Sequence, residues 1–187
     1  VSTELAPTPW NPQTLLLAIG IKGYELPKTQ LPPANLVFLI DVSGSMESSD
    51  KLELLKPALK LLTRQLRAED KVAIVVYAGA AGMVLEPTPG SQKAKIEAAL
   101  DRLSAGGSTN GGAGIQLAYR LARDGFVKGG VNRVILATDG DFNVGAVDFE
   151  GLKNLVETQR KSGVALTTLG FGAGNYNDRL MEQLADA

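Results

Sequence analysis

The sequence predicts a doubly wound α/β fold, in which a mostly parallel open sheet carries helices on both faces and an extra β-strand precedes it. Short apolar runs typical of strands buried on both faces alternate with amphipathic segments of ten or more residues. This alternation implies crossover connections and therefore parallel strands. The chain has 187 residues, which suffices for one domain with a sizeable core.

The N-terminal part differs from the rest in composition. Residues 1–14 are rich in Pro, Thr and Asn, and we expect an irregular lead-in there. Residues 14–24 read TLLLAIGIKGY, which predicts a strand, and the segment 25–33 has the composition of a linker. We therefore expect a lead-in with one extra strand over residues 1–34 and the main domain over residues 35–187.

The main domain begins with the apolar run LVFLI at 36–40. The pattern predicts further strands at 71–78, 83–87, 132–141 and 164–172, and helices at about 50–66, 91–103, 115–125, 148–163 and 177–187. Only small residues join the runs 71–78 and 83–87, which predicts a hairpin.

The helix expected at 50–66 carries leucines at three- and four-residue spacing from Leu52 to Leu66. Leu54 and Leu61 widen the apolar face, so we expect this helix to be well buried. Asp50 and Glu53 together predict a capping box at its start.

Composition excludes several classes of function. The chain has no Cys and no His, which rules out the usual zinc sites, thiol catalysis, disulfides and a Ser-His-Asp triad. The formal net charge is −1 and the basic residues are scattered, so we expect neither nucleic-acid binding nor insertion into a membrane. The apolar run 15–21 is too short to span a bilayer. Because the chain begins with Val rather than Met, we expect a piece of a longer protein.

Oxygen-bearing side chains follow two of the predicted strands. Asp41, Ser43 and Ser45 come directly after the run at 36–40, and Asp139 lies near the end of the run at 132–141. Thr109 lies in a glycine-rich loop, SAGGSTNGGAG. Because the carboxyl ends of parallel strands meet at one edge of a sheet, these groups should lie near one point. Carboxylates and hydroxyls are hard donors that suit Mg²⁺, which prefers six oxygen ligands.

This set resembles the metal-ion-dependent adhesion site (MIDAS) of von Willebrand factor type A domains. The family pattern is Asp-x-Ser-x-Ser, then a Thr, then an Asp after a later strand. The resemblance covers residues 35–187. All five positions of the pattern match in order: Asp41, Ser43, Ser45, Thr109 and Asp139. It implies a Rossmann-like domain that binds Mg²⁺ or Mn²⁺, with Ca²⁺ less favoured.

The resemblance also implies a role for each matching residue. Ser43 and Ser45 would ligate the ion directly, Thr109 directly or through water, and Asp41 and Asp139 mainly through waters. An acidic side chain of a partner protein would complete the shell, so the domain would be an interaction module and not an enzyme. Residues near the site could form a rim that selects the partner: Glu47, Asp141 and Asn143.

The N-terminal strand resembles a bacterial subgroup of the family that has extra β-structure before the domain and more chain after it. The family would continue past residue 187 with a further strand and helix. This resemblance implies an extracytoplasmic or cell-envelope location.

Other interpretations of the same residues remain open. The Asp-Ser cluster could cap the next helix, and Asp139 could begin a turn. Residues 139–150 place acids or Asn at positions 1, 3, 5 and 12 of an EF-hand loop, but Val144 replaces the glycine that such a loop needs. The glycine-rich loop lacks the lysine of a phosphate-binding loop. Four aromatic residues show no spacing typical of a stacking platform and are expected to be packing residues: Trp10, Tyr24, Tyr77 and Tyr119.

A purely structural domain with a vacant site, inside a larger surface protein, is one alternative. The other is a Mg²⁺-dependent phosphoryl-transfer hydrolase, because some phosphatases place an Asp at the end of their first strand. Such enzymes need a second acid two residues later, where this chain has Ser43. They also need a cation to hold the phosphate, and we expect no lysine near these loops.

Overall fold

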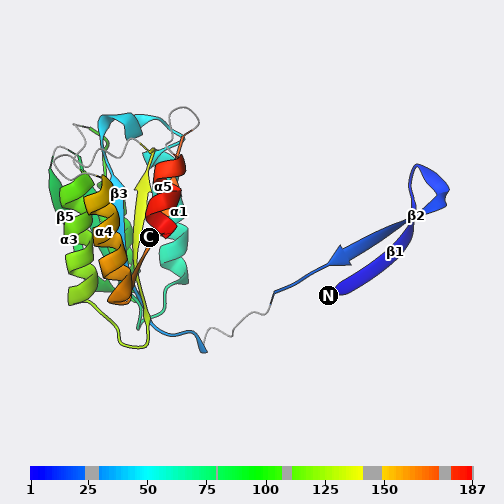
Figure 1. Ribbon diagram of the computed structural model, residues 1–187, viewed down its shortest axis with the longest axis horizontal. Coiled ribbons are helices and arrows are strands. Elements are labelled where there is room, and N and C mark those ends of the chain that lie inside the picture. Colours follow the sequence, from blue (N-terminus) through cyan, green and yellow to red (C-terminus); the bar gives the residue numbers. More distant parts are fainter. Residues whose placement is uncertain (24–29, 79, 107–110, 141–148, 173–177, 187) are drawn as a thin grey trace. The chain divides into compact units, whose positions relative to one another are not determined.

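The computed structural model describes residues 1–23, 30–78, 80–106, 111–140, 149–172 and 178–186. The chain forms two compact units, Val1–Leu31 and Pro32–Ala187. The first is built around two strands, and the second contains a five-stranded sheet with its helices (Figure 1).

The first unit is a β-hairpin. Strands β1 (Ser2–Thr8) and β2 (Asn11–Gly20) are antiparallel, with Leu5 opposite Leu17. The expectation of an irregular lead-in over residues 1–14 is therefore wrong for residues 2–8 and 11–14. Its prolines are compatible with a strand because each strand of a two-stranded sheet has one edge without a hydrogen-bonded neighbour. The expectation that Trp10 is a packing residue is also wrong, because it lies in the turn that joins the two strands and is 77% exposed. Tyr24 lies outside the described residues.

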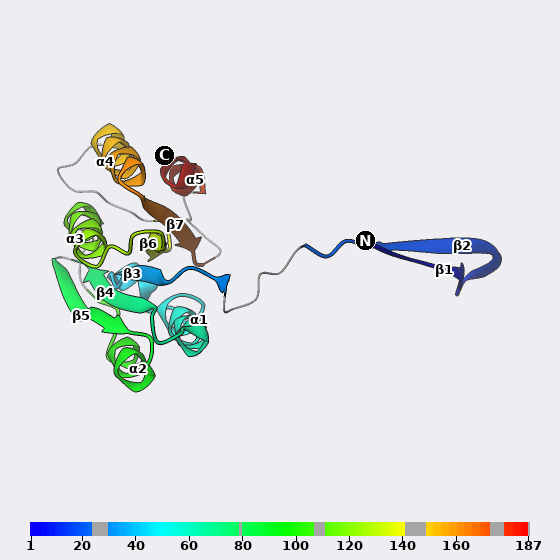
Figure 2. The ribbon, with the colours of Figure 1, turned by 90° about the horizontal axis from the view of Figure 1, so that it is seen from below.

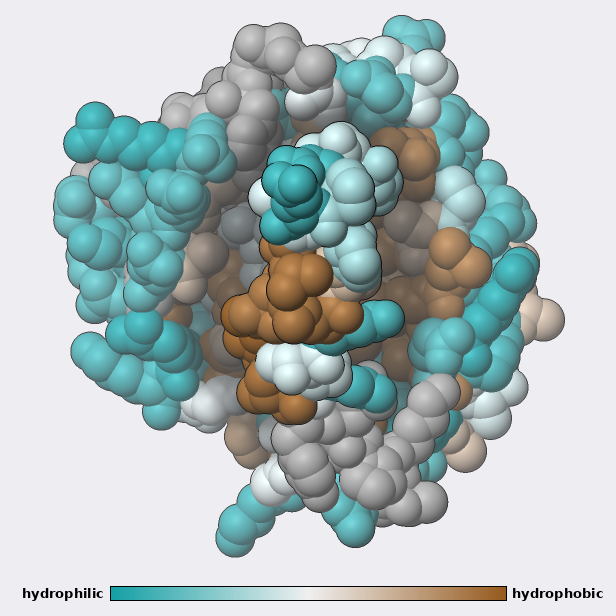
Figure 3. Space-filling view, turned by 90° about the vertical axis from the view of Figure 1, so that its right-hand side faces the viewer, coloured by the Kyte–Doolittle hydropathy of each residue, from teal (hydrophilic) through white to brown (hydrophobic). Residues whose placement is uncertain are grey.

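One face of this hairpin is apolar and exposed. In the observed register Leu5, Leu15, Leu17 and Ile19 point to the same side, because residues opposite each other or two apart share a face. Each of these four side chains is more than half exposed. Figure 3 shows, in brown, where hydrophobic residues lie on one side of the molecular surface. A two-stranded hairpin is marginally stable in water, so this face is suited to packing against further structure.

The sheet of the second unit is mixed and mostly parallel. Its strands are β3 (Ala34–Asp41), β4 (Lys71–Tyr77), β5 (Ala81–Pro89), β6 (Val131–Thr138) and β7 (Val164–Gly170), in the spatial order β5-β4-β3-β6-β7. β3 pairs in parallel with β4 and β6, and β6 pairs in parallel with β7. β5 is the antiparallel edge strand that the small-residue connection predicted.

Helices cover both faces of the sheet (Figure 2). α3 (Gly111–Asp124), α4 (Phe149–Lys161) and α5 (Asp178–Asp186) pack on one face, and α1 (Leu52–Gln65) and α2 (Lys93–Asp101) on the other. The strands supply both layers: Val37 and Leu39 belong to the first core cluster, and Phe38 and Ile40 to the second. The predicted fold class is confirmed, and the continuous apolar runs are explained by burial on both sides.

Helix α1 corrects two expectations. It begins at Leu52, and the carboxylate of Asp50 accepts a hydrogen bond from the Ser48 hydroxyl rather than capping the helix. The helix is buried on one side only, since Leu54 is 52% exposed and Leu61 62% exposed. A helix lying on a sheet buries a stripe, and the second set of leucines lies outside that stripe.

Helix α3 approaches the sheet closely at Gly114. A Cβ atom added there would lie 2.9 Å from the Cβ of Tyr77 and 3.2 Å from a Cδ of Leu39. Both neighbours are fully buried, so neither can move aside at low cost.

We therefore expect Gly114→Ala to lower the free energy of unfolding by about 1–3 kcal/mol, because overpacking outweighs the gain in helix propensity. Urea denaturation measures this. Gly82→Ala is the control, because a Cβ there meets nothing within 4 Å. Equal stability of the two variants would contradict the close packing of α3.

Asp70 holds the start of the central strand β3 through hydrogen bonds to its carboxylate. It accepts hydrogen bonds from the backbone N–H of Ala34 at 2.9 Å and of Arg67 at 2.7 Å. The Arg67 guanidinium donates to the same carboxylate at 2.9 Å. Burial raises the pKa of Asp70, but the hydrogen bonds from Arg67 and Ala34 outweigh it and hold the pKa below its ordinary value.

Because the folded-state pKa of Asp70 lies below its unfolded value, the carboxylate stabilises the fold above about pH 4, and this contribution is lost as the pH falls through the folded pKa. Asp70→Asn should cost about 1.5–3 kcal/mol at pH 7 and less near pH 3, which lies below the unfolded pKa. Denaturation at both pH values measures this. Asp101→Asn, on the exposed face of α2, is the control, and a cost for Asp70→Asn that does not change with pH would contradict the argument.

Candidate metal centre

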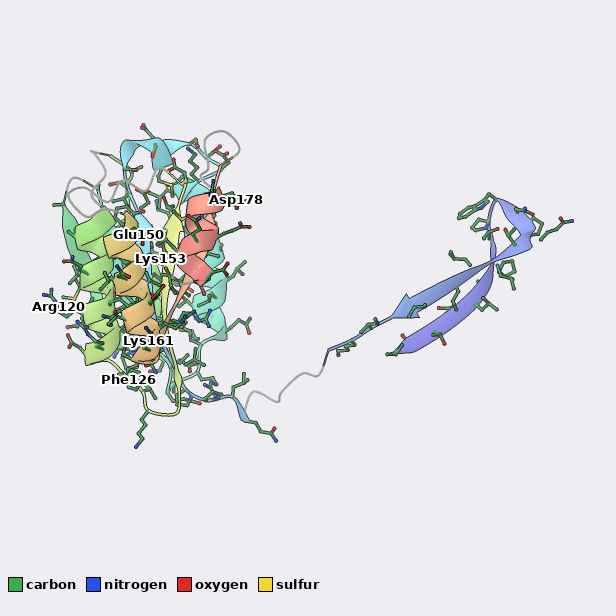
Figure 4. The ribbon with its side chains drawn as sticks, in the orientation of Figure 1. Arg120, Phe126, Glu150, Lys153, Lys161 and Asp178 are labelled. Carbon is green, nitrogen blue, oxygen red and sulfur yellow. The ribbon has the colours of Figure 1, made fainter. Side chains whose placement is uncertain are left out.

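The predicted site residues lie where two neighbouring strands end. Asp41 is the last residue of β3, and Asp139 directly follows β6. Ile40 lies opposite Ala137 in the parallel register, so both aspartates follow paired strand ends. The carboxyl ends of β3 and β6 lie at one end of the domain, whereas Phe126 lies at the other (Figure 4). The sheet thus brings together two acids nearly a hundred residues apart.

Asp41 is completely buried, and hydrogen bonds to both of its carboxylate oxygens fix the orientation of the side chain. Its Oδ1 accepts a hydrogen bond from the backbone N–H of Ser43 at 2.9 Å. Its Oδ2 accepts from the hydroxyls of Tyr77 at 3.1 Å and Thr138 at 2.9 Å. Burial raises the pKa of Asp41, and the hydrogen bonds from Ser43, Thr138 and Tyr77 oppose that rise. A nearby cation would offset the cost of the buried charge further.

Sequence reasoning missed how this carboxylate is held. Tyr77 was expected only to pack, yet its hydroxyl donates to Asp41. Burial, and then the charge of Asp41, raise the pKa of Tyr77 well above its ordinary value, so the hydroxyl stays protonated and can donate. Thr138 also accepts a hydrogen bond from the N–H of Gly140 at 3.2 Å. The available signals were positional, because Tyr77 pairs with Asp41 across β3 and β4, and Thr138 directly precedes Asp139.

The two serines lie in a tight turn after β3. Ser43 leads into a short 3₁₀ helix, η2 (Gly44–Glu47), in which the N–H of Met46 donates to the carbonyl of Ser43 at 3.0 Å. The Met46 side chain is fully buried and anchors this turn. The hydroxyls of Ser43 and Ser45 are hydrogen-bonded to each other, with their oxygens 3.0 Å apart, and Ser43 is only 2% exposed.

This separation fits a small divalent ion. Adjacent ligands of an octahedral ion with bonds of about 2.0–2.1 Å lie about 2.8–3.0 Å apart. The longer bonds of Ca²⁺ need a wider spacing. Among the described residues, no three His, Cys, Asp or Glu side chains gather closely enough to hold an ion, so hydroxyls would have to supply part of the shell. The donor set that the chain provides is therefore compatible with Mg²⁺ or Mn²⁺.

A lysine also lies at the site. The ammonium of Lys51 donates to Asp139 Oδ2 at 2.8 Å and to the carbonyl oxygen of Ser45 at 2.9 Å. The expectation that no lysine is near these loops is therefore wrong. Lys51 is six residues beyond Ser45, and the turn of η2 brings it back over the end of β6.

The remaining predicted positions have different outcomes. Glu47 is exposed at the end of η2, as a rim residue would be. The other three positions lie outside the described residues, so their places at the site stay predictions: Thr109, Asp141 and Asn143.

Comparison with known proteins identifies the family. The model of the von Willebrand factor type A domain matches residues 35–187. The chain belongs to this family. The observed sheet and the paired strand ends that carry Asp41 and Asp139 agree with the resemblance that the motif indicated.

Relatives extend this result. The protein YfbK of Escherichia coli (strain K12) is 53% identical over 183 residues, which cover 98% of this chain and 32% of that protein. The chain therefore spans about a third of the length of this relative. Because the match covers 98% of this chain, it extends over the N-terminal hairpin, and the resemblance to a bacterial subgroup is confirmed.

Solved structures share the fold at low sequence identity. Proximal thread matrix protein 1 from the mussel byssus, with a zinc-occupied MIDAS motif, has a TM-score of 0.68 at 20% identity, covering 83% of this chain and 42% of that one. The manganese-loaded TRAP protein of Plasmodium vivax has a TM-score of 0.69 at 19% identity, covering 83% and 63%. None of the helices in the described segments is long and apolar enough to cross a membrane.

Thr138→Val should lower the free energy of unfolding by about 1–3 kcal/mol in metal-free buffer, because a fully buried hydroxyl that bonds both Asp41 and Gly140 is lost. Chemical denaturation measures this. Thr158→Val, on the exposed side of α4, removes a hydroxyl bonded only within its own helix and should change stability by less than about 0.5 kcal/mol. Equal effects would show that the Thr138 hydroxyl does not support the site.

Proposed function

We propose that this domain is a divalent-metal-dependent protein-binding module for adhesion or assembly. Mg²⁺ or Mn²⁺ would be held by a MIDAS-type site whose five residues are Asp41, Ser43, Ser45, Thr109 and Asp139. The observation that carries the proposal is the pair of hydroxyls 3.0 Å apart beside two buried carboxylates. An acidic group of a partner protein would complete the coordination shell.

Charge and ligand count support an open site. Two carboxylates that act mainly through waters, together with neutral hydroxyls, would leave a divalent ion incompletely neutralised and would not fill its octahedral shell from protein atoms alone. An ion bound there would supply a fixed positive charge and a vacant position for a carboxylate. The chain's own residues keep their donors in place, because Asp41 is held by three hydrogen bonds and the serines by a turn anchored on the buried side chain of Met46.

The relatives point the same way. Domains of this family mediate protein binding. The mussel byssus structure has zinc at its MIDAS motif, and the Plasmodium vivax protein is loaded with manganese. We transfer from these proteins only the expectation that a MIDAS-type site binds a divalent ion.

The hydrolase alternative is less favoured. Lys51 removes one objection to it, because a cation is present. However, Asp41 is completely buried, and both of its oxygens already accept hydrogen bonds, so it is not placed to attack a phosphate. Two residues later stands Ser43 rather than an acid. Domains of this family are usually non-catalytic.

The proposal is tested by calorimetric titration of Mg²⁺ and Mn²⁺ into metal-stripped protein. Asp41→Asn keeps the shape of the buried side chain and removes its charge, so we expect binding to weaken at least about tenfold while the fold survives. Asp124→Asn, exposed at the end of α3, is the matched control and should bind like the wild type.

A second arm tests the partner chemistry. A short Glu-containing peptide should bind the wild type in Mg²⁺ and not in EDTA, and its amidated Gln counterpart should not bind in either. Absence of metal binding by a folded wild-type chain would contradict the proposal. Turnover of a phosphate ester that is lost in Asp41→Asn would favour the hydrolase instead.

A further inference from the structure

Lys51 occupies an unusual position for a positive charge. It is the N-cap residue of α1, and its carbonyl accepts the first helical hydrogen bonds from the N–H groups of Leu54 and Leu55. The N-terminus of a helix carries a partial positive charge, so a cation there is electrostatically unfavourable. Ordering a lysine side chain also costs conformational entropy. A compensating interaction must hold the ammonium in place.

That interaction comes from the metal centre itself. The ammonium donates to Asp139 Oδ2 at 2.8 Å and to the Ser45 carbonyl at 2.9 Å, and the Lys51 side chain is only 15% exposed. Asp139 is 1% exposed, so this is an ion pair largely shielded from solvent. Such pairs interact more strongly than surface pairs because little water screens them.

A third segment confines the lysine stem. Gly172, just beyond the end of β7, has a φ of +84°, which favours glycine. A Cβ atom at this position would lie 2.6 Å from Cε of Lys51. The stem therefore passes through a space that only a residue without a side chain leaves open. Lys51 is directed to Asp139 by the chain after β3, the end of β6 and the chain after β7.

From this geometry we propose that Lys51 is a built-in counter-cation of the metal centre, which neutralises Asp139 in the metal-free domain and lowers the affinity of the site for divalent ions. This inference rests on the proposed function. The ammonium and a divalent ion draw on the negative charge of the same carboxylate. Since like charges at such short range repel each other, the ion either displaces the ammonium or binds against its charge.

The counter-cation has two effects that can be measured separately. Without metal, it offsets the burial of Asp139 and stabilises the fold. With metal, it weakens binding, so that a metal ion alone occupies the site less fully than two carboxylates would otherwise allow. Removing the charge of Lys51 should therefore destabilise the metal-free protein and tighten metal binding. If Lys51 only positioned the site, its replacement would lower both the stability and the metal affinity.

The test compares Lys51→Met with the wild type in the 187-residue chain, using calorimetric titration of Mg²⁺ and Mn²⁺ alone and thermal unfolding in EDTA. We expect the variant to bind about tenfold more tightly, equivalent to about 1.4 kcal/mol, and to melt at a lower temperature in EDTA. Lys60→Met is the matched control, because it removes the same charge from α1 but from an ion pair with Asp101 away from the site. It should bind metal like the wild type.

Lys51→Gln provides a second variant if Lys51→Met does not fold without metal, since it removes the charge and keeps a hydrogen-bond donor. Unchanged or weaker metal binding by both variants, with binding by the wild type intact, would overturn the counter-cation and leave the proposed function standing. Binding by neither the wild type nor the variants would overturn the proposed function and this inference with it. Binding only after loss of the Lys51 charge would support the counter-cation but contradict the proposed function, which requires metal binding by the wild-type chain.

Discussion

The structure of the site depends on one constraint, the burial of a carboxylate at the end of the central strand. Asp41 is removed from solvent, and the free energy of that burial has to be offset locally. The backbone of Ser43 and the hydroxyls of Tyr77 and Thr138 provide the offset, and each comes from a different strand or strand end. The carboxylate therefore has a fixed direction before any ion arrives, which is the pre-organisation that a metal site needs.

This constraint connects the site to the core. Tyr77 donates to Asp41 at one end of its side chain, and its Cβ lies against the close approach of α3 at Gly114. Packing of a helix on the sheet thus helps to fix the position of a hydroxyl at the site. Packing and polar chemistry here are parts of one arrangement, because protein interiors are close-packed and transmit small displacements.

The sequence was informative wherever a pattern repeats. Alternating apolar runs predicted the parallel sheet, and the spacing of Asp41, Ser43 and Ser45 predicted a cluster of oxygen donors at a strand end. The N-terminal hairpin was missed in part because proline-rich composition hides a strand whose prolines lie in a two-stranded sheet. The exposure of Leu54 was missed because periodicity does not reveal how wide a stripe the sheet covers.

The place of Lys51 could not be predicted because it depends on tertiary geometry. No spacing rule relates a residue at a helix start to an acid 88 positions later. The contact exists because η2 reverses the chain direction and Gly172 leaves room for the lysine stem. The same holds for Thr138, whose hydroxyl is significant only because β6 lies beside β3.

The pairing of β3 with β6 has a consequence for how the protein folds. Thr138 and Asp41 are 97 residues apart in sequence, so the two strands meet only after a long stretch of chain has been closed into a loop. Contacts of such long range form slowly, because loop-closure entropy is lost before they contribute. The proposed donor set is complete only once that pairing exists, because Asp139 reaches the end of β3 only through it. An ion that required the complete set would add its binding free energy to the stability of the native state.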